Sequence, residues 1–402
     1  MKTFLRKLGP GFLFAGAAIG VSHLVQSTRA GADFGFGLLW ALLLINLIKY
    51  PFFQFGPRYA SATGKNLVEG YRSLGKGVLI AYFFITFGTM FTIQTAVTIV
   101  TAGIASSLFG WGSSIVWVTI ITGICFAILL IGKYKILDTL MKFIVLSLTI
   151  STIVAVILAT KSVGTVDFQQ IFPKDAMSIA FLIAFMGWMP APLDISIWHS
   201  IWTVEKKKIN PSVTPKQSNF DFNVGYITTT LLGIGFIALG ALVMFDSGES
   251  FSSNGTQFAN QLISMYTLSL GDWAKIIIGV AALTTMFSTT LTTLDASPRV
   301  MHQTSELLLH KVFKKGYLFW ILILMGGTLS IFFFFISEMG LLIKIATILS
   351  FLTAPFYAVI NFILVNGKQM PKSERPSHFL NGLSIVGIVV LIGFGLWFLT
   401  TL

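Results

Sequence analysis

Apolar stretches separated by short polar segments run through all 402 residues of this chain. Eleven of these stretches approach or exceed the roughly 20 residues that an α-helix needs to cross a bilayer. The pattern predicts an all-α integral membrane protein whose residues 1–402 form a single transmembrane domain. The expected spans are residues 9–30, 35–56, 78–109, 115–132, 139–160, 176–203, 223–246, 271–296, 317–336, 340–365 and 380–400.

Lysine and arginine gather in alternate polar segments and so orient the spans. With the N-terminus inside, the inner segments hold 21 of the 27 basic residues, whereas the outer loop 247–271 holds none. An excess of Lys and Arg marks cytoplasmic loops. We therefore expect a protein of the bacterial inner (plasma) membrane, with its N-terminus in the cytoplasm and its C-terminus outside.

Composition narrows the function classes. The chain is 55% hydrophobic and 10% charged, and its mean hydropathy of +0.84 is typical of a membrane protein. Its net charge of +12 is spread over six short inner segments, whereas nucleic-acid binding needs one basic surface. Neither His-Glu-x-x-His nor Gly-x-Ser-x-Gly occurs, so we expect no enzyme and no cofactor. The expected partners are the bilayer and a small solute or metal ion, and the oligomeric state stays open.

The sixth span contains two prolines in the segment 186–192, Met-Gly-Trp-Met-Pro-Ala-Pro. Proline lacks an amide hydrogen and clashes with the carbonyl four residues back, so Pro190 and Pro192 should free the carbonyls of Met186 and Trp188. Broken backbone at membrane depth is tolerated where it is buried or lines a cavity, and transporters bind substrates at such breaks. The segment therefore predicts a ligand site.

Eleven spans with a break in the sixth suggest two inverted five-helix repeats, residues 1–160 and 176–365, followed by an extra helix at 380–400. The first span is the counterpart of the sixth in this arrangement. It carries the weak helix formers Gly-Val-Ser-His at 20–23, and a histidine near mid-membrane is costly without a partner. We expect helices 1 and 6 to be unwound at mid-membrane and to hold the substrate between them.

Motifs in the first two spans resemble the Nramp metal-ion transporters of the LeuT-type (APC) superfamily. They are Gly-Pro-Gly-Phe-Leu at 9–13, Ala-Gly-Ala-Asp-Phe-Gly at 30–35 and Ala-Thr-Gly-Lys at 62–65. Met189-Pro190 matches the start of the family's helix 6 Met-Pro-His motif. The resemblance implies a LeuT-type fold, alternating access and, by family default, uptake of divalent metal cations driven by an ion gradient.

The chain departs from the family at the site itself. The family's Asp-Pro-Gly-Asn motif aligns with residues 20–23, so Gly20 replaces the metal-binding aspartate and His23 replaces the asparagine. Ala191 replaces the helix 6 histidine. Of the ligand set that the resemblance implies, only Met189 and the carbonyl of Met186 remain.

Two substrate classes stay open after these replacements. A metal could bind to Met189, the Met186 carbonyl and His23, because imidazole and thioether ligands suit softer ions. Alternatively, the chain is a sodium- or proton-coupled transporter of a small organic solute such as an amino acid, since half-helix N-termini bind carboxylates. A channel is a further alternative, because broken helices also line pores. In either transporter, the expected substrate contacts are Gly20, Ser22, His23, Met186, Gly187, Met189 and Asp194.

At three of these positions, a purely structural role is the alternative to a functional one. His23 would then bond a helix 6 carbonyl, Asp194 would contact His199, and Asp295 would pair with Arg299.

The third span has no Asp or Glu, so the family's usual proton route is missing. In sodium-coupled LeuT-type transporters, hydroxyls of helix 8 and carbonyls of helix 1 bind sodium. This resemblance makes Ser288 and Thr289 candidates for a coupling-ion site. The alternative is that these hydroxyls bond their own backbone and serve helix packing.

Overall fold

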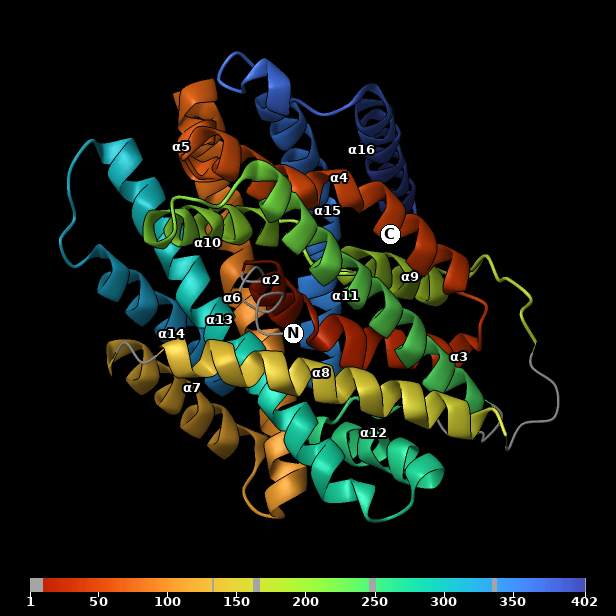
Figure 1. The fold of residues 1–402 in the computed structure, drawn as a ribbon. Coiled ribbons are helices and arrows are strands. Elements are labelled where there is room, and N and C mark those ends of the chain that lie inside the picture. The colour runs from red at the N-terminus through yellow and green to blue at the C-terminus, as the bar shows by residue number, and fades with distance from the viewer. Residues whose placement is uncertain (1–9, 132–133, 162–166, 246–250, 335–337, 402) are drawn as a thin grey trace.

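The computed structural model describes residues 10–131, 134–161, 167–245, 251–334 and 338–401, and in these ranges the regular elements are helices (Figure 1). The helices are α2 (Pro10–Ala18), η1 (Ser22–Ser27), α3 (Thr28–Phe34), α4 (Leu39–Thr63), α5 (Leu67–Leu74), α6 (Lys76–Phe109), α7 (Ser114–Ile131), α8 (Tyr134–Ala159), α9 (Ala176–Trp188), α10 (Ile195–Ile209), α11 (Pro215–Val243), α12 (Gly255–Leu270), α13 (Ala274–Leu309), α14 (Gly316–Phe334), α15 (Met339–Asn366), η2 (Lys372–Glu374) and α16 (His378–Leu399).

Each of the eleven expected spans corresponds to a helix or to an interrupted helix. Eight are continuous helices that are long and apolar enough to cross a membrane: α4, α6, α7, α11, α13, α14, α15 and α16. The others are α8 and the two interrupted helices. Some helices are longer than the apolar spans predicted from the sequence. For example, α13 continues to Leu309 instead of ending near residue 296. Hydropathy marks only the apolar part of such a helix.

Helix 1 comprises α2, η1 and α3, and helix 6 comprises α9 and α10. Helix 1 bends at residues 19–20 and then makes one π-helical stretch at Ser22–Ser27. Helix 6 is non-helical at residues 189–194, where the peptide bond between Met189 and Pro190 is cis. Both expected interruptions are therefore present, and the second follows from prolines that cannot donate a hydrogen bond.

Helix 1 lies inside the molecule, where α2 packs against α10, α11 and α13, and α3 packs against α11. Glycines permit the close approach to α11. A Cβ at Gly11 would lie 2.1 Å from the carbonyl oxygen of Asp221, and one at Gly225 would lie 2.2 Å from that of Gly11. These positions exclude any larger side chain unless the two helices separate.

The remaining long helices surround the two interrupted helices, helix 1 and helix 6. In Figure 1, α6 and α13 run against each other through the middle, while α16 lies at the edge, where it packs on α4 and α15. The helix 6 segment α9 packs against α15. As a result, the two interruptions lie among α4, α6, α13 and α15. The division at residues 160 and 176 into two repeats stays a prediction.

Candidate functional site

A central cavity lies between the two interruptions. Gly20, Val21 and Ser22 line it from helix 1, and Trp188 and Pro192 line it from helix 6. The rest of the described lining is Ala17, Ala18, Ile93, Val97, Ile195, Trp198, Thr289 and Thr293. These side chains include hydroxyls and indoles but no carboxylate, thiol or imidazole. The cavity is thus a mainly apolar space with a few neutral polar groups.

The freed carbonyls of helix 6 bond to a lysine of α4. Lys49 is fully buried, and its Nζ lies 2.7 Å from the carbonyl oxygens of both Met186 and Gly187. The carbonyl oxygens of Met189 and Ala191 lie 3.1 and 3.4 Å from the same nitrogen. An ammonium has three donors, whereas a neutral amine has two. In its ammonium form, Lys49 would give one donor to each of the three nearest carbonyls in the break of helix 6.

Sequence reasoning missed Lys49, although a signal was present. It lies inside the expected span 35–56, and a lysine within a membrane helix is rare, costly and a candidate for function. Its partners were not readable from the sequence, because 137 residues separate it from Met186.

His23 is fully buried, and both ring nitrogens have partners. Nε2 lies 2.8 Å from the carbonyl oxygen of Thr229, which can only accept, so Nε2 carries a proton. Nδ1 lies 2.7 Å from Oγ of Ser22 and 3.1 Å from the carbonyl oxygen of Ala18. The predicted structural role for His23, a hydrogen bond to a carbonyl of helix 6, is wrong because the acceptor, Thr229, belongs to α11. In this arrangement no ring nitrogen of His23 is turned into the central cavity.

The helix 6 candidates contribute backbone atoms and close packing. The sulfur of Met189 lies 3.5 Å from the hydroxyl oxygen of Ser27, while its carbonyl faces Lys49. A Cβ at Gly187 would lie 2.2 Å from the carbonyl oxygen of Thr347, so this glycine lets α9 approach α15. Of the two predicted metal ligands, the carbonyl of Met186 therefore contacts Lys49 and the sulfur of Met189 contacts Ser27.

The small size of Gly20 does not leave an empty volume beside its Cα. A Cβ there would lie 2.9 Å from Oγ1 of Thr289 and 3.0 Å from Cγ2. The threonine side chain fills the volume beside Gly20. A larger side chain at position 20 would therefore require Thr289 to move, and the role of Gly20 in substrate binding stays a prediction.

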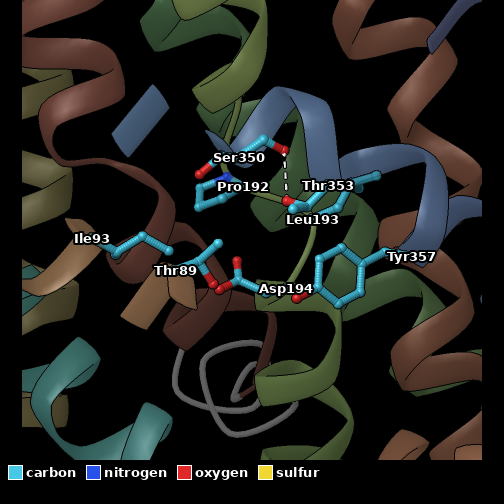
Figure 2. Close-up of a pocket in the computed structure, with 8 residues that line it drawn as sticks. All are labelled: Thr89, Ile93, Pro192, Leu193, Asp194, Ser350, Thr353 and Tyr357. Carbon is cyan, nitrogen blue, oxygen red and sulfur yellow. Dashed lines mark hydrogen bonds between the residues drawn. The ribbon is translucent and has the colours of Figure 1, made fainter. Parts of the chain in front are cut away.

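Asp194 lines a second pocket instead of the central cavity (Figure 2). It is buried, and its Oδ1 has no hydrogen-bond partner among the described residues. The alternative contact with His199 is not formed, since both ring nitrogens of His199 also lack partners within the described ranges. Ile93 and Pro192 border both pockets, so the two are adjacent.

The helix 8 candidates lie on α13 and are buried. The hydroxyl of Thr289 lies 3.2 Å from the carbonyl oxygen of Thr285, its own helix, and 3.5 Å from that of Gly16 in helix 1. Ser288 is buried beside it. One hydroxyl therefore joins α13 to helix 1, with its shorter contact inside α13, and the sodium role of both residues stays a prediction.

A network of neutral side chains joins α6 to α13. The side-chain oxygen of Gln94 accepts from the hydroxyl of Thr293 at 2.6 Å, and the hydroxyls of Thr101 and Thr290 lie 2.7 Å apart.

The carboxylate of Asp295 pairs with Arg299 at 2.8 Å, as expected for a structural role.

Within the part of the chain that the structure describes, no three His, Cys, Asp or Glu side chains form a group able to hold a metal ion. The site thus combines a buried lysine, the backbone carbonyls that it contacts and an uncharged cavity.

The model of the natural resistance-associated macrophage protein-like (Nramp) family matches residues 11–401. The chain belongs to the Nramp family. An uncharacterized protein of Pasteurella multocida strain Pm70 is 36% identical and aligns over 98% of this chain and 91% of its own length. Nramp proteins are membrane transporters, and this chain is therefore a transporter and not an enzyme.

Solved structures confirm the LeuT-type fold of this Nramp protein. The manganese transporter of Eremococcus coleocola superposes with a TM-score of 0.76 at 14% identity, over 98% of this chain and 86% of its own. MhsT in complex with L-phenylalanine superposes with a TM-score of 0.66 at 16% identity, over 96% of this chain and 98% of its own. The all-helical LeuT-type fold that the sequence predicted is thus confirmed.

Proposed function

We propose that this Nramp protein is a secondary transporter of a small organic solute, such as an amino acid, driven by an ion gradient. The observation that carries the proposal is the contact of the Lys49 Nζ with three carbonyl oxygens of helix 6, from which we infer that Lys49 is an ammonium ion, since only an ammonium has three donors. It occupies, as a tethered cation, the backbone site at which a transported metal ion would bind. The uncharged cavity has a mainly apolar lining with a few polar groups, which is the kind of lining that contacts a solute with an apolar part.

The electrostatic cost of a metal ion at this position is large. A divalent ion lies at most about 2.6 Å from a coordinating oxygen, and the Met186 oxygen lies 2.7 Å from Nζ. The ion would therefore be at most about 5 Å from the ammonium. At an effective dielectric constant of about 20, charges of +2 and +1 at that distance repel by ~7 kcal/mol. Such a penalty weakens binding by about five orders of magnitude.

The same charge favours a substrate carboxylate. An ammonium at the break of helix 6 and the N-terminal end of η1 both attract anions. Trp188, Ile93 and Val97 supply apolar surface for a side chain. The structural neighbour MhsT, crystallised with L-phenylalanine, shows that this fold accommodates a solute of that kind.

Metal transport is the second candidate, and family membership favours it. It would require Lys49 to leave the carbonyls of Met186 and Met189, so that these oxygens and the Met189 sulfur could face an ion. The two candidates therefore differ in what Lys49 does, and a Lys49 variant separates them.

The test is uptake into proteoliposomes of labelled L-phenylalanine, the other amino acids and labelled manganese. We expect saturable amino-acid uptake by the unmodified protein and no manganese uptake. Calorimetry should show no manganese binding to the unmodified protein and measurable binding to Lys49→Ala, which removes the ammonium. Lys344→Ala, an exposed lysine of α15, is the matched control. Saturable manganese uptake by the unmodified protein, with no transport of any amino acid, would overturn the proposal.

A further inference from the structure

The second pocket holds a carboxylate with no role in the central cavity. Asp194 ends the non-helical segment of helix 6, and Figure 2 shows its carboxylate between the side chains of Thr89 and Tyr357. The Asp194 side chain makes no capping hydrogen bond to α10, and the N–H of Ile195 donates to the carbonyl oxygen of Pro192 at 3.2 Å. The Oδ1 of Asp194 lacks a partner among the described residues.

The hydroxyls around Asp194 do not supply the missing hydrogen bond. Thr89, Ser350 and Thr353 each donate to the carbonyl four residues earlier in their own helix, at 2.9, 2.8 and 2.9 Å. Each therefore offers only lone pairs to the pocket. The hydroxyl of Tyr357 has no partner in the described chain and does not bond the carboxylate.

The incomplete set of donors around Asp194 favours the binding of a proton or another cation to its carboxylate. An ionised carboxylate buried without a full set of donors costs several kcal/mol. A proton removes the charge and gives the carboxyl group a donor for the surrounding lone pairs.

We propose that Asp194 is the coupling-ion site of this transporter and binds the proton that moves with the substrate, in a pocket separate from the substrate cavity. The proposal rests on the proposed secondary transport but not on the identity of the solute. It gives the chain a proton carrier in place of the acidic residues that its third span lacks.

The titratable groups near Asp194 single it out as the one that exchanges a proton. The groups with an electrostatic interaction with it are Lys49 on α4, Tyr71 on α5, Tyr82 on α6 and Tyr357 on α15. Tyrosine does not ionise in the pH range of transport. Lys49 contacts the helix 6 carbonyls and is not among the described residues that line either pocket.

The proton site is connected to the substrate cavity by direct contacts. Trp188 lines the cavity and donates its indole N–H to the hydroxyl of Ser350, which lines the second pocket, at 2.7 Å. Pro192 borders both spaces from the same non-helical segment. Movement of helix 6 during alternating access would therefore change both sites together.

Infrared difference spectroscopy over a pH series tests the proton site without any substrate. We expect the purified protein to show the carbonyl stretching band of a buried carboxylic acid that titrates with pH. Asp194→Asn should remove the band, Asp194→Glu should shift it, and Asp272→Asn, at an exposed position, should leave it unchanged. A spectrum of the unmodified protein without such a band would overturn the proposal whether or not the variants fold, as would a band that persists in Asp194→Asn.

Transport in proteoliposomes tests the coupling, with L-phenylalanine as the probe. An inward proton gradient should accelerate uptake by the unmodified protein, and Asp194→Asn should reduce this acceleration at least tenfold while counterflow at equal pH persists. Uptake driven by a sodium gradient at constant pH, or unchanged coupling in Asp194→Asn, would refute the proton role. An infrared band without L-phenylalanine uptake would refute this probe as a substrate and still support the proton site.

Discussion

Replacing Lys49 with methionine tests whether the ammonium holds the break of helix 6 in place. The change keeps an unbranched apolar side chain and removes the charge. Hydrogen bonds to charged groups contribute about 1.5–3 kcal/mol each, and Lys49 makes three of 2.7, 2.7 and 3.1 Å. Part of that gain offsets the cost of burying an ion. Loss of one side of a buried charged network costs about 3–5 kcal/mol, and we expect a destabilisation in this range.

Thermal unfolding in detergent, followed by size-exclusion chromatography, measures the effect. We expect Lys49→Met to lower the unfolding midpoint by on the order of 5–10 °C. The matched control is Lys344→Met, because Lys344 is exposed on α15 and a surface change is worth at most about 0.5 kcal/mol. Lys49→Arg should fall between the two, since a planar guanidinium carries the charge but not the compact donor geometry. Equal midpoints for Lys49→Met and Lys344→Met would refute the assignment of Lys49 as the ion that satisfies these carbonyls.

Two further predictions concern glycines whose space a neighbour fills. Gly20→Asp should destabilise the protein by about 1–3 kcal/mol through overpacking against Thr289, because a Cβ there would meet Oγ1 at 2.9 Å. The double variant with Thr289→Ala should recover most of the loss, and additive changes in the unfolding midpoint would count against a steric cause. Gly225→Ala should abolish or strongly lower the yield of folded protein, since its Cβ would lie 2.2 Å from the carbonyl oxygen of Gly11. Gly123→Ala, which meets nothing within 4 Å, should be neutral or stabilising by up to about 1 kcal/mol, and equal yields of the two variants would contradict the close crossing of helix 1 and α11.

Short helices between the spans were not predicted. The helix α5 has 8 residues and α12 has 16, and both fall below the length of about 20 residues that marks a bilayer span. Their signals are local caps instead. Asn66 and Glu69 form a capping box at the start of α5, and Asn254 caps α12. A search for caps as well as apolar runs would have found them.

The sequence by itself determined the features that depend on neighbouring residues. An apolar run of sufficient length must become a helix in lipid, because the bilayer offers no other partner for the backbone. Pro190 and Pro192 break helix 6 for an equally local reason, the missing amide hydrogens. The pairing of Asp295 with Arg299 was predictable because residues four apart meet on one helix face.

Only the tertiary structure decided what fills the site. Lys49 meets the carbonyl of Met186 across 137 residues of chain, and Thr289 of α13 occupies the space beside Gly20. Asp194 lies five residues from Met189, yet it faces another pocket, formed with α6 and α15. The sequence shows which chemical groups this transporter contains. Which of these groups contact one another depends on how the helices cross and where close packing leaves space. Neither property can be predicted from a short segment of the sequence.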